Sequence, residues 1–214
     1  MKLRKLIAIL SSVAVVTTAA FASLQITGNA APAQGLSRIE LRQQMRRLWE
    51  DHVFWTREFI VDVAANLPET SLTAARLLRN QQDIGDAIKP FYGERAGDTL
   101  ASLLRRHILI AATMLKAAKA GNQVVFNRAK ARWYANASRI AHFLHGLNPR
   151  HWRLSALEAM MKRHLNLTLK EAVDQLTGHF GASIADFDRV EAEILEMADM
   201  LSTGIIRQFP GKFH

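Results

Sequence analysis

The chain has 214 residues, no cysteine and a formal net charge of +9 at pH 7. The lack of cysteine excludes disulfide bonds, thiolate metal sites and thiol nucleophiles from its chemistry. The length is sufficient for one domain with a sizeable hydrophobic core.

Residues 1–22 have the pattern of a signal peptide. Met1–Lys5 is short and basic, Leu6–Ala19 is apolar, and Ala20–Ala22 supplies the small-x-small cleavage motif. We therefore expect cleavage before Ser23 and export of the protein to the periplasm or the extracellular space. The alternative, an uncleaved membrane anchor, is less favoured because the apolar run is short for a bilayer span.

The rest of the sequence predicts a flexible lead-in over residues 23–36 and a single helical domain over residues 37–214. Apolar residues recur at helical spacing, and no segment alternates in the way that strands require. The pattern predicts long helices over 37–66, 70–89, 94–120, 124–145 and 183–207, and short helices over 155–164 and 168–178. We predict an all-α fold, an up-and-down helical bundle of four to five long helices with short helices near the C-terminal third. No second apolar stretch is long enough to span a bilayer.

The charge is unevenly distributed. Three basic residues fall in the predicted signal peptide, which leaves +6 for the rest of the chain. Residues 100–165 contain twelve Lys and Arg but one acid, whereas residues 166–204 contain eight acids but two basic residues. A basic helix pair packed beside an acidic helix explains this, and so does a basic surface for an anionic partner. Nucleic acid is disfavoured as that partner, because the protein is expected to be exported and its basic residues are not interleaved with aromatic ones.

Two histidines interrupt apolar helical stripes and are expected to point into the core. His52 shares a stripe with Trp55 and Phe59, and His107 lies on the core face of its helix. If His52, Asp83 and His107 converge, they could hold a divalent metal ion such as zinc or copper. The Glu-x-x-His motif of dinuclear iron bundles is missing, so the predicted metal site is of a looser kind.

The same polar positions are also compatible with two roles that involve no metal ion. In the first, both histidines are ordinary core residues whose hydrogen bonds are satisfied by neighbouring side chains. In the second, the interior holds a small ligand, with Trp55, Arg57, Asn80 and Asn136 as the residues that bind it. Buried polar groups cost stability unless they are paired, so a polar network in the core is a sign of function.

Enzyme signatures are missing from the sequence. There is no Gly-x-Ser-x-Gly elbow, and there is no strand to support one. The glycines around Gly85 and Gly93–Gly97 lack the lysine and the spacing of a phosphate-binding loop. The sequence therefore favours a binding protein over an enzyme.

Several segments of the chain resemble a bacterial family of short helical proteins. The first is Leu48-Trp-Glu-Asp-His52 followed by Trp55-Thr-Arg57, and the second is Leu78-Arg-Asn-Gln-Gln-Asp-Ile-Gly85. The others are Ile88-Lys-Pro-Phe-Tyr-Gly93, Met197-Ala-Asp-Met-Leu201 and Gly204–Phe213. The resemblance covers nearly all of residues 37–214 and implies one helical domain, but it implies no reaction. The polar positions that fall in its motifs or in the core stripes are Asp51, His52, Arg57, Asn80, Asp83, His107, Asn136 and Asp199.

Together these patterns predict an exported helical-bundle binding protein with a buried polar site for a metal ion or a small ligand. The alternative is a non-catalytic structural or interaction protein of the cell envelope, whose basic surface contacts an anionic partner.

Overall fold

The structure is a computed structural model that describes residues 36–214. The predicted signal peptide and all of the predicted lead-in except Leu36 lie outside the described residues. The described part forms six long α-helices and a short 3₁₀ helix. They are α1 (Arg38–Ala65), α2 (Thr70–Tyr92), α3 (Glu94–Lys119), α4 (Gln123–Leu147), α5 (Leu154–Leu176), α6 (Phe180–Gln208) and η1 (Pro210–Lys212).

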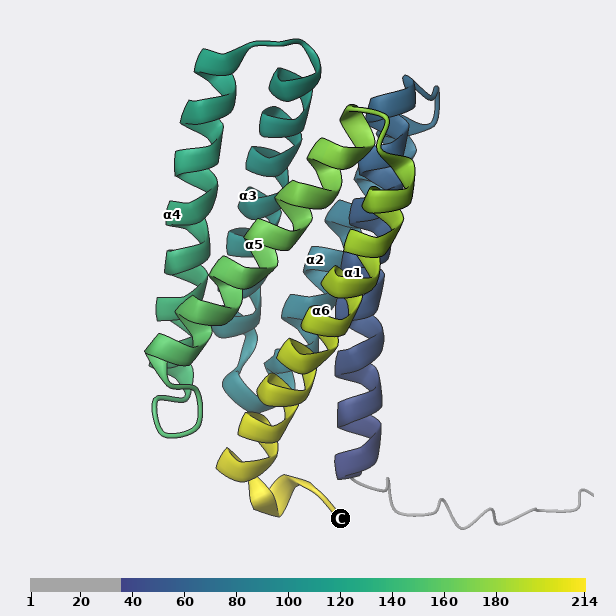
Figure 1. Ribbon diagram of the computed structural model, residues 1–214. Coiled ribbons are helices and arrows are strands. Elements are labelled where there is room, and N and C mark those ends of the chain that lie inside the picture. Colours follow the sequence, from purple (N-terminus) through teal and green to yellow (C-terminus); the bar gives the residue numbers. More distant parts are fainter. Residues whose placement is uncertain (1–35) are drawn as a thin grey trace, which may run out of the picture. The chain divides into compact units, whose positions relative to one another are not determined.

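The helices pack side by side, and consecutive helices run in opposite directions (Figure 1). Each helix contacts the next one along the chain, and α6 returns to pack against α1. The all-α prediction is confirmed for residues 36–214, which contain no strand. No helix within these residues is both long enough and apolar enough to span a membrane.

Local sequence signals explain most helix ends. Ser37 and Glu40 form the capping box of α1, with each side chain accepting a hydrogen bond from the other residue's backbone N–H. Asn66 ends α1 in the left-handed conformation, at φ 56°. Gly93, at φ 84°, makes the sharp turn from α2 to α3 in a conformation that favours glycine.

The predicted helix count was wrong in the C-terminal third. The two short helices predicted over 155–164 and 168–178 are one continuous helix, α5. Thr168 is therefore inside a helix and buried, rather than at a helix start. Similarly, α6 begins at Phe180, so Ser183 lies inside its first turns. Thr168 with Glu171, and Ser183 with Asp186, have the spacing of a capping motif at a helix start. That motif is a local signal, and packing against neighbouring helices outweighed it at both places.

The lower end of the domain in Figure 1 is closed by aromatic packing and by hydrogen bonds. Trp152, in the α4–α5 loop, is 1% exposed and packs against Tyr92 and Gly204. The Asn148 side chain donates to the carbonyl of Gly204 at 3.0 Å, and the Gln208 side chain donates to the carbonyl of Leu147 at 3.0 Å. These contacts tie the α4–α5 loop to the C-terminal end of α6.

The buried apolar residues form two clusters along the helices. On α1, Leu41 to Val53 belong to the larger cluster and Phe59 to Val63 to the smaller one. On α5, Leu157 to Leu165 belong to the larger cluster, and Ala172 belongs to the smaller one. Buried polar side chains interrupt both clusters, and the candidate site includes three of them, His52, His107 and His164.

The crossing of α2 and α3 depends on two glycines that bring the backbones together. A Cβ atom at Gly85 would lie 2.5 Å from the carbonyl oxygen of Gly97 and 2.8 Å from Cβ of Ala101. Gly85→Ala should therefore lower the free energy of unfolding by about 1–3 kcal/mol, because the helices must separate. Chemical denaturation of the variant and the parent measures this.

Gly146→Ala is the matched control, since Gly146 is also helical and a Cβ atom there meets no neighbour within 4 Å. It should be neutral or slightly stabilising, because alanine favours helix. Equal effects of the two substitutions would contradict close packing at Gly85.

Candidate ligand-binding site

A cavity of about 50 Å³ lies inside the helices, next to the smaller apolar cluster. Side chains from α1, α2, α3, α4 and α5 surround it. Most of the lining is apolar; the polar lining residues are His52, Thr56, His107, Trp133, His164 and Thr168. No Lys, Arg, Asp or Glu lines the cavity.

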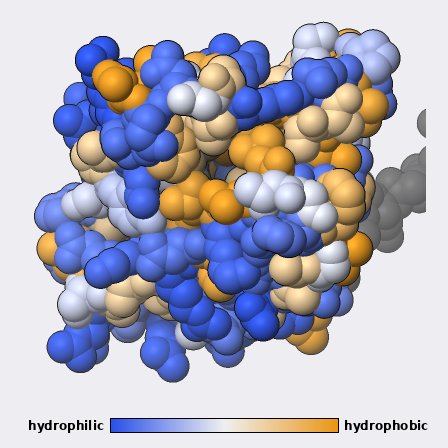
Figure 2. Space-filling view, turned by 45° about the horizontal axis from the view of Figure 1, so that its top comes forward, coloured by the Kyte–Doolittle hydropathy of each residue, from blue (hydrophilic) through white to orange (hydrophobic). Residues whose placement is uncertain are grey.

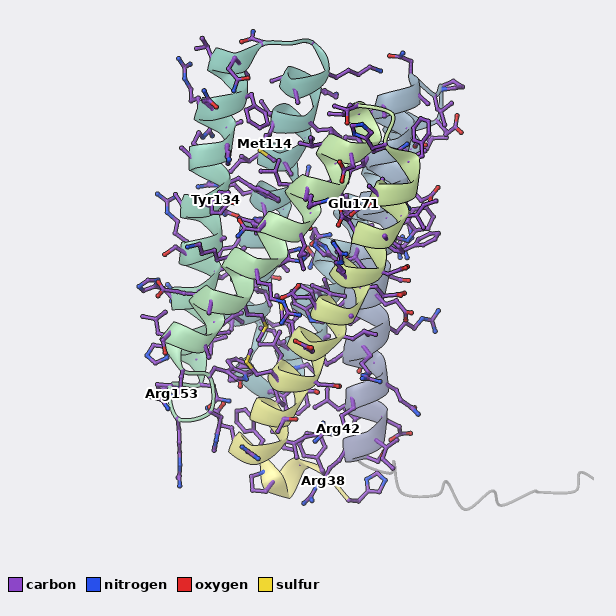
Figure 3. The ribbon with its side chains drawn as sticks, viewed as in Figure 1. Arg38, Arg42, Met114, Tyr134, Arg153 and Glu171 are labelled. Carbon is purple, nitrogen blue, oxygen red and sulfur yellow. The ribbon has the colours of Figure 1, made fainter. Side chains whose placement is uncertain are left out.

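The cavity exists because small side chains and diverging helices leave space. Ala111, Ala112 and Ala118 line it from α3, and Ala172 lines it from α5. Among consecutive helices α4 and α5 share the least contact, and they move apart toward the upper end in Figure 1. Figure 3 labels Met114, which lines the cavity from α3, in this upper half of the domain.

Three histidines from three helices line the cavity. His52 comes from α1, His107 from α3 and His164 from α5, and each is at most 4% exposed. The ring centroids of His52 and His164 are 5.9 Å apart. His107 packs on the indole of Trp133 with a centroid distance of 5.1 Å.

A hydrogen bond fixes the tautomer of His107. Its Nδ1 lies 2.9 Å from Oδ1 of Asn136, and Nδ2 of Asn136 donates to the carbonyl of Leu103 at 3.3 Å. Because the amide nitrogen faces that carbonyl, its oxygen must face the histidine and accept. Nδ1 of His107 therefore carries the proton, and Nε2 has the free lone pair.

His164 is held in a similar way. Its Nδ1 lies 3.1 Å from Oε2 of Glu193, which is fully buried on α6. A carboxylate accepts, so Nδ1 of His164 donates this hydrogen bond. A third buried side chain makes a contact of this kind between α2 and α1. The Asn80 side chain donates to the carbonyl of Leu48 at 2.9 Å.

Two of the three cavity histidines, His52 and His107, are held neutral. Burial, followed by the charges of His164 and His107, lowers the pKa of His52 well below its usual value. Burial, and then His164, lowers the pKa of His107 to about 3. An imidazolium in this apolar enclosure would lose its hydration and would face other histidines, so the neutral forms are favoured.

Three buried polar atoms of lining residues have no hydrogen-bond partner in the described chain. They are Nδ1 of His52, Oγ1 of Thr168 and Nε1 of Trp133. Unpaired buried polar atoms are rare in folded proteins, because each costs about 1–3 kcal/mol. Three of the eight such atoms in residues 36–214 belong to residues that line this one cavity, where a polar group of a bound molecule can pair with them.

One residue that lines the cavity from α5 is exposed at the surface. Val173 on α5 both lines the cavity and is 43% exposed. The hydroxyl of Tyr134 on α4 (Figure 3) donates to Oδ1 of Asn166 on α5 at 2.5 Å, and this hydrogen bond joins the two helices. Figure 2 shows hydrophobic residues in the middle of a largely hydrophilic face.

A second polar network lies beside the cavity. Nη1 of Arg57 on α1 is 2.9 Å from Oε1 of Glu171 on α5 and 3.3 Å from Oγ of Ser183 on α6. Burial raises the pKa of Glu171 to about 7, although its ion pair with Arg57 opposes the rise. This network joins three helices, but none of its residues lines the cavity.

The structure brings together only some of the residues predicted from the sequence. His52 and His107 line the cavity, and Asn136 orients His107. Asn80 is buried and contacts the backbone of α1 instead. Asn80 and Asn136 are therefore supporting residues, not lining ones.

Trp55, Arg57 and Asp83 lie outside the cavity lining. Trp55 packs under the guanidinium of Arg76 at 5.1 Å, and Arg57 belongs to the Glu171 network. Asp83 is half-buried and lines a separate surface groove with Leu48. Among residues 36–214, no three His, Asp or Glu side chains are arranged to hold a metal ion.

The predicted site omitted His164, Thr168 and Glu193. His164, Thr168 and Glu171 are spaced i, i+4 and i+7 and share one face of α5. The signal is visible in the sequence once residues 154–176 are treated as one helix. The prediction of two short helices placed His164 and Thr168 in different helices, so their shared face was not recognised.

Comparisons with protein-family models, with curated proteins and with solved structures give no match to this chain.

His52 and His107 make the stability of the protein depend on pH. In the unfolded chain they take up protons near pH 6.5, whereas in the folded protein their pKa values are depressed. Their contribution to stability is complete above about pH 6.5 and is lost as the pH falls toward 3, by about 1.4 kcal/mol per pH unit for each histidine. His107→Gln should therefore flatten the slope of unfolding free energy against pH by about that amount.

His142→Gln is the control, since its side chain is 59% exposed. Glu171 acts in the opposite direction, because its raised pKa stabilises the folded protein below about pH 4.5 and that stability is lost as the pH rises through 7. It contributes equally in the parent and both variants, so the comparison cancels it. Identical slopes for the parent and His107→Gln would show that His107 titrates normally.

Proposed function

We propose that this protein is an exported, non-enzymatic binding protein that holds one small ligand in the three-histidine cavity. The observation that carries the proposal is the placement of unpartnered polar atoms, from His52, Thr168 and Trp133, around a cavity with apolar walls. Binding sites combine these two features, because apolar walls supply affinity and a few polar groups supply orientation.

The size of the cavity limits its occupant. One water molecule needs roughly 10–15 Å³, and an engineered cavity of about 150 Å³ binds benzene. At about 50 Å³, the enclosed space suits a molecule or part of a molecule of only a few non-hydrogen atoms. A longer ligand would extend toward solvent between α4 and α5.

Export of the protein is part of the proposal, and it rests on the sequence pattern of residues 1–22. The resemblance of the helical motifs to a bacterial family of short helical proteins agrees with a single helical domain. A divalent metal ion is the second ligand considered for the same cavity, because an oxygen acceptor on Nδ1 is the usual way to orient a histidine ligand. His107 and His164 both have such an acceptor.

The test is to fill the cavity without harming the fold. Ala112→Leu adds apolar volume to the lining and should abolish ligand binding with little loss of stability. Ala135→Leu is the matched control, since Ala135 is exposed on α4. Amide chemical shifts of the mature protein would be followed during titration with small organic molecules and, separately, with zinc, and elemental analysis would measure any metal retained on purification.

Shifts of lining residues in the parent and in Ala135→Leu, but not in Ala112→Leu, support the proposal. Stoichiometric zinc that is lost in His52→Ala and His107→Ala would identify the ligand as a metal ion. Shifts that persist in Ala112→Leu would place the binding elsewhere, and no shift with any compound or ion would contradict the proposed function.

A second candidate function is binding to an anionic surface of the cell envelope. Helix α4 contains no acidic residue and carries exposed Arg128, Arg132 and Arg139. None of the three forms an ion pair within residues 36–214, although surface arginines elsewhere do. An uncompensated basic helix is attracted to phosphate-bearing surfaces.

Replacing these three arginines by glutamine should reduce binding to phosphatidylglycerol vesicles by about 10-fold or more, since each charge near such a surface contributes about 1 kcal/mol. Vesicle sedimentation at low and high salt measures it, because screening should weaken the parent's binding. The control removes the same charge elsewhere, by changing exposed Arg38, Arg47 and Arg79 to glutamine. Equal losses in both triple variants would point to net charge rather than to α4.

A further inference from the structure

We infer that the ligand of the three-histidine cavity is an uncharged molecule with a hydroxyl group at the end of a short apolar chain. This deepens the proposed function and rests on it. The inference comes from which hydrogen-bonding atoms the cavity offers, which charges it lacks and how much space it encloses.

The cavity offers an acceptor that requires a donor on the ligand. Asn136 occupies Nδ1 of His107, so the acceptor left on that neutral ring is Nε2. A ligand with only acceptor atoms, such as a ketone or an ether, cannot pair with it.

The cavity also offers donors that require an acceptor on the ligand. The indole N–H of Trp133 donates only, and the hydroxyl of Thr168 can donate; both lack a partner in the described chain. His52 Nδ1 is unpartnered as well and can take either role with its tautomer. A hydroxyl is the smallest group that donates one hydrogen bond and accepts others, so it matches this mixed set.

Charge excludes the usual ionic ligands. No Lys or Arg lines the cavity to pair with a carboxylate or a phosphate, and no Asp or Glu lines it to pair with an ammonium group. Moving an unpaired ion from water into an apolar enclosure is far more costly than moving a neutral group. The depressed pKa values of His52 and His107 show the same penalty acting on the protein's own side chains.

The volume of the cavity and its apolar walls limit the size and polarity of the rest of the ligand. About 50 Å³ accommodates a hydroxyl group and a few carbon atoms. Phe59, Ile108 and Leu115 form apolar walls that favour a hydrocarbon chain over a second polar group. A short primary alcohol is the simplest probe with these properties.

The experiment compares 1-butanol, butyrate and butylammonium, which have the same chain length but different charge. Each is titrated into the mature protein at neutral pH, and the indole N–H shift of Trp133 and the backbone amide shifts are recorded. We expect 1-butanol to bind at least 10-fold more tightly than either ion. Thr168→Val should weaken butanol binding by about 10-fold, the value of one hydrogen bond, with the exposed Thr99→Val as the matched control.

The outcomes separate this inference from the proposal on which it rests. If butyrate or butylammonium binds as tightly as butanol and Ala112→Leu abolishes that binding, the cavity is a binding site but the ligand class is wrong. If butanol binds equally well to the parent, Thr168→Val and Ala112→Leu, it binds outside the cavity and the inference fails. If neither these probes, nor other small molecules, nor zinc perturb the lining residues, the proposed function fails too.

Discussion

The need to pair buried polar groups is the constraint on which this structure depends. Three polar contacts cross from one helix to the next along the chain. Asn80 joins α2 to α1, His107 joins α3 to Asn136 on α4, and His164 joins α5 to Glu193 on α6. Each contact fixes the register of one helical pair, because sliding the helices would leave the polar groups unpaired in an apolar interior.

The two ends of the domain are packed differently, and this difference explains the cavity. At the lower end, Trp152 fills the space beside Gly204, and hydrogen bonds hold the α4–α5 loop to α6. At the upper end in Figure 1, α4 and α5 diverge, and alanines from α3 line the cavity. The sealed end supplies stability, while the looser end keeps space next to the imidazoles. A protein selected only for packing density would be expected to fill that space.

The supporting residues decide what the histidines can do. Asn136 and Glu193 do not line the cavity, yet they determine which nitrogen of each ring is protonated. The residues that orient these histidine rings therefore lie behind the cavity wall and not in it. His52 differs, since its Nδ1 meets the criteria for a hydrogen bond with no side chain or backbone group of residues 36–214.

The sequence predicted the fold class well and the site in part. Helical periodicity identified the all-α fold, because each amphipathic helix must bury one apolar face. It also placed His52 and His107 in the core, since both interrupt apolar stripes. It mispredicted α5, because Thr168 and Glu171 look like a capping box and only the neighbouring helices show that the segment continues through them.

The sequence by itself determined which side chains are inside, because hydrophobic periodicity reports burial residue by residue. Only the tertiary structure decided which of them meet. Asp83, one residue before the buried Ile84 on α2, lies in a surface groove, whereas His164, more than fifty residues after His107 in the chain, shares its cavity. The rotation and register of the helices decide such neighbours, and these depend on packing between segments far apart in the chain, which no local pattern records.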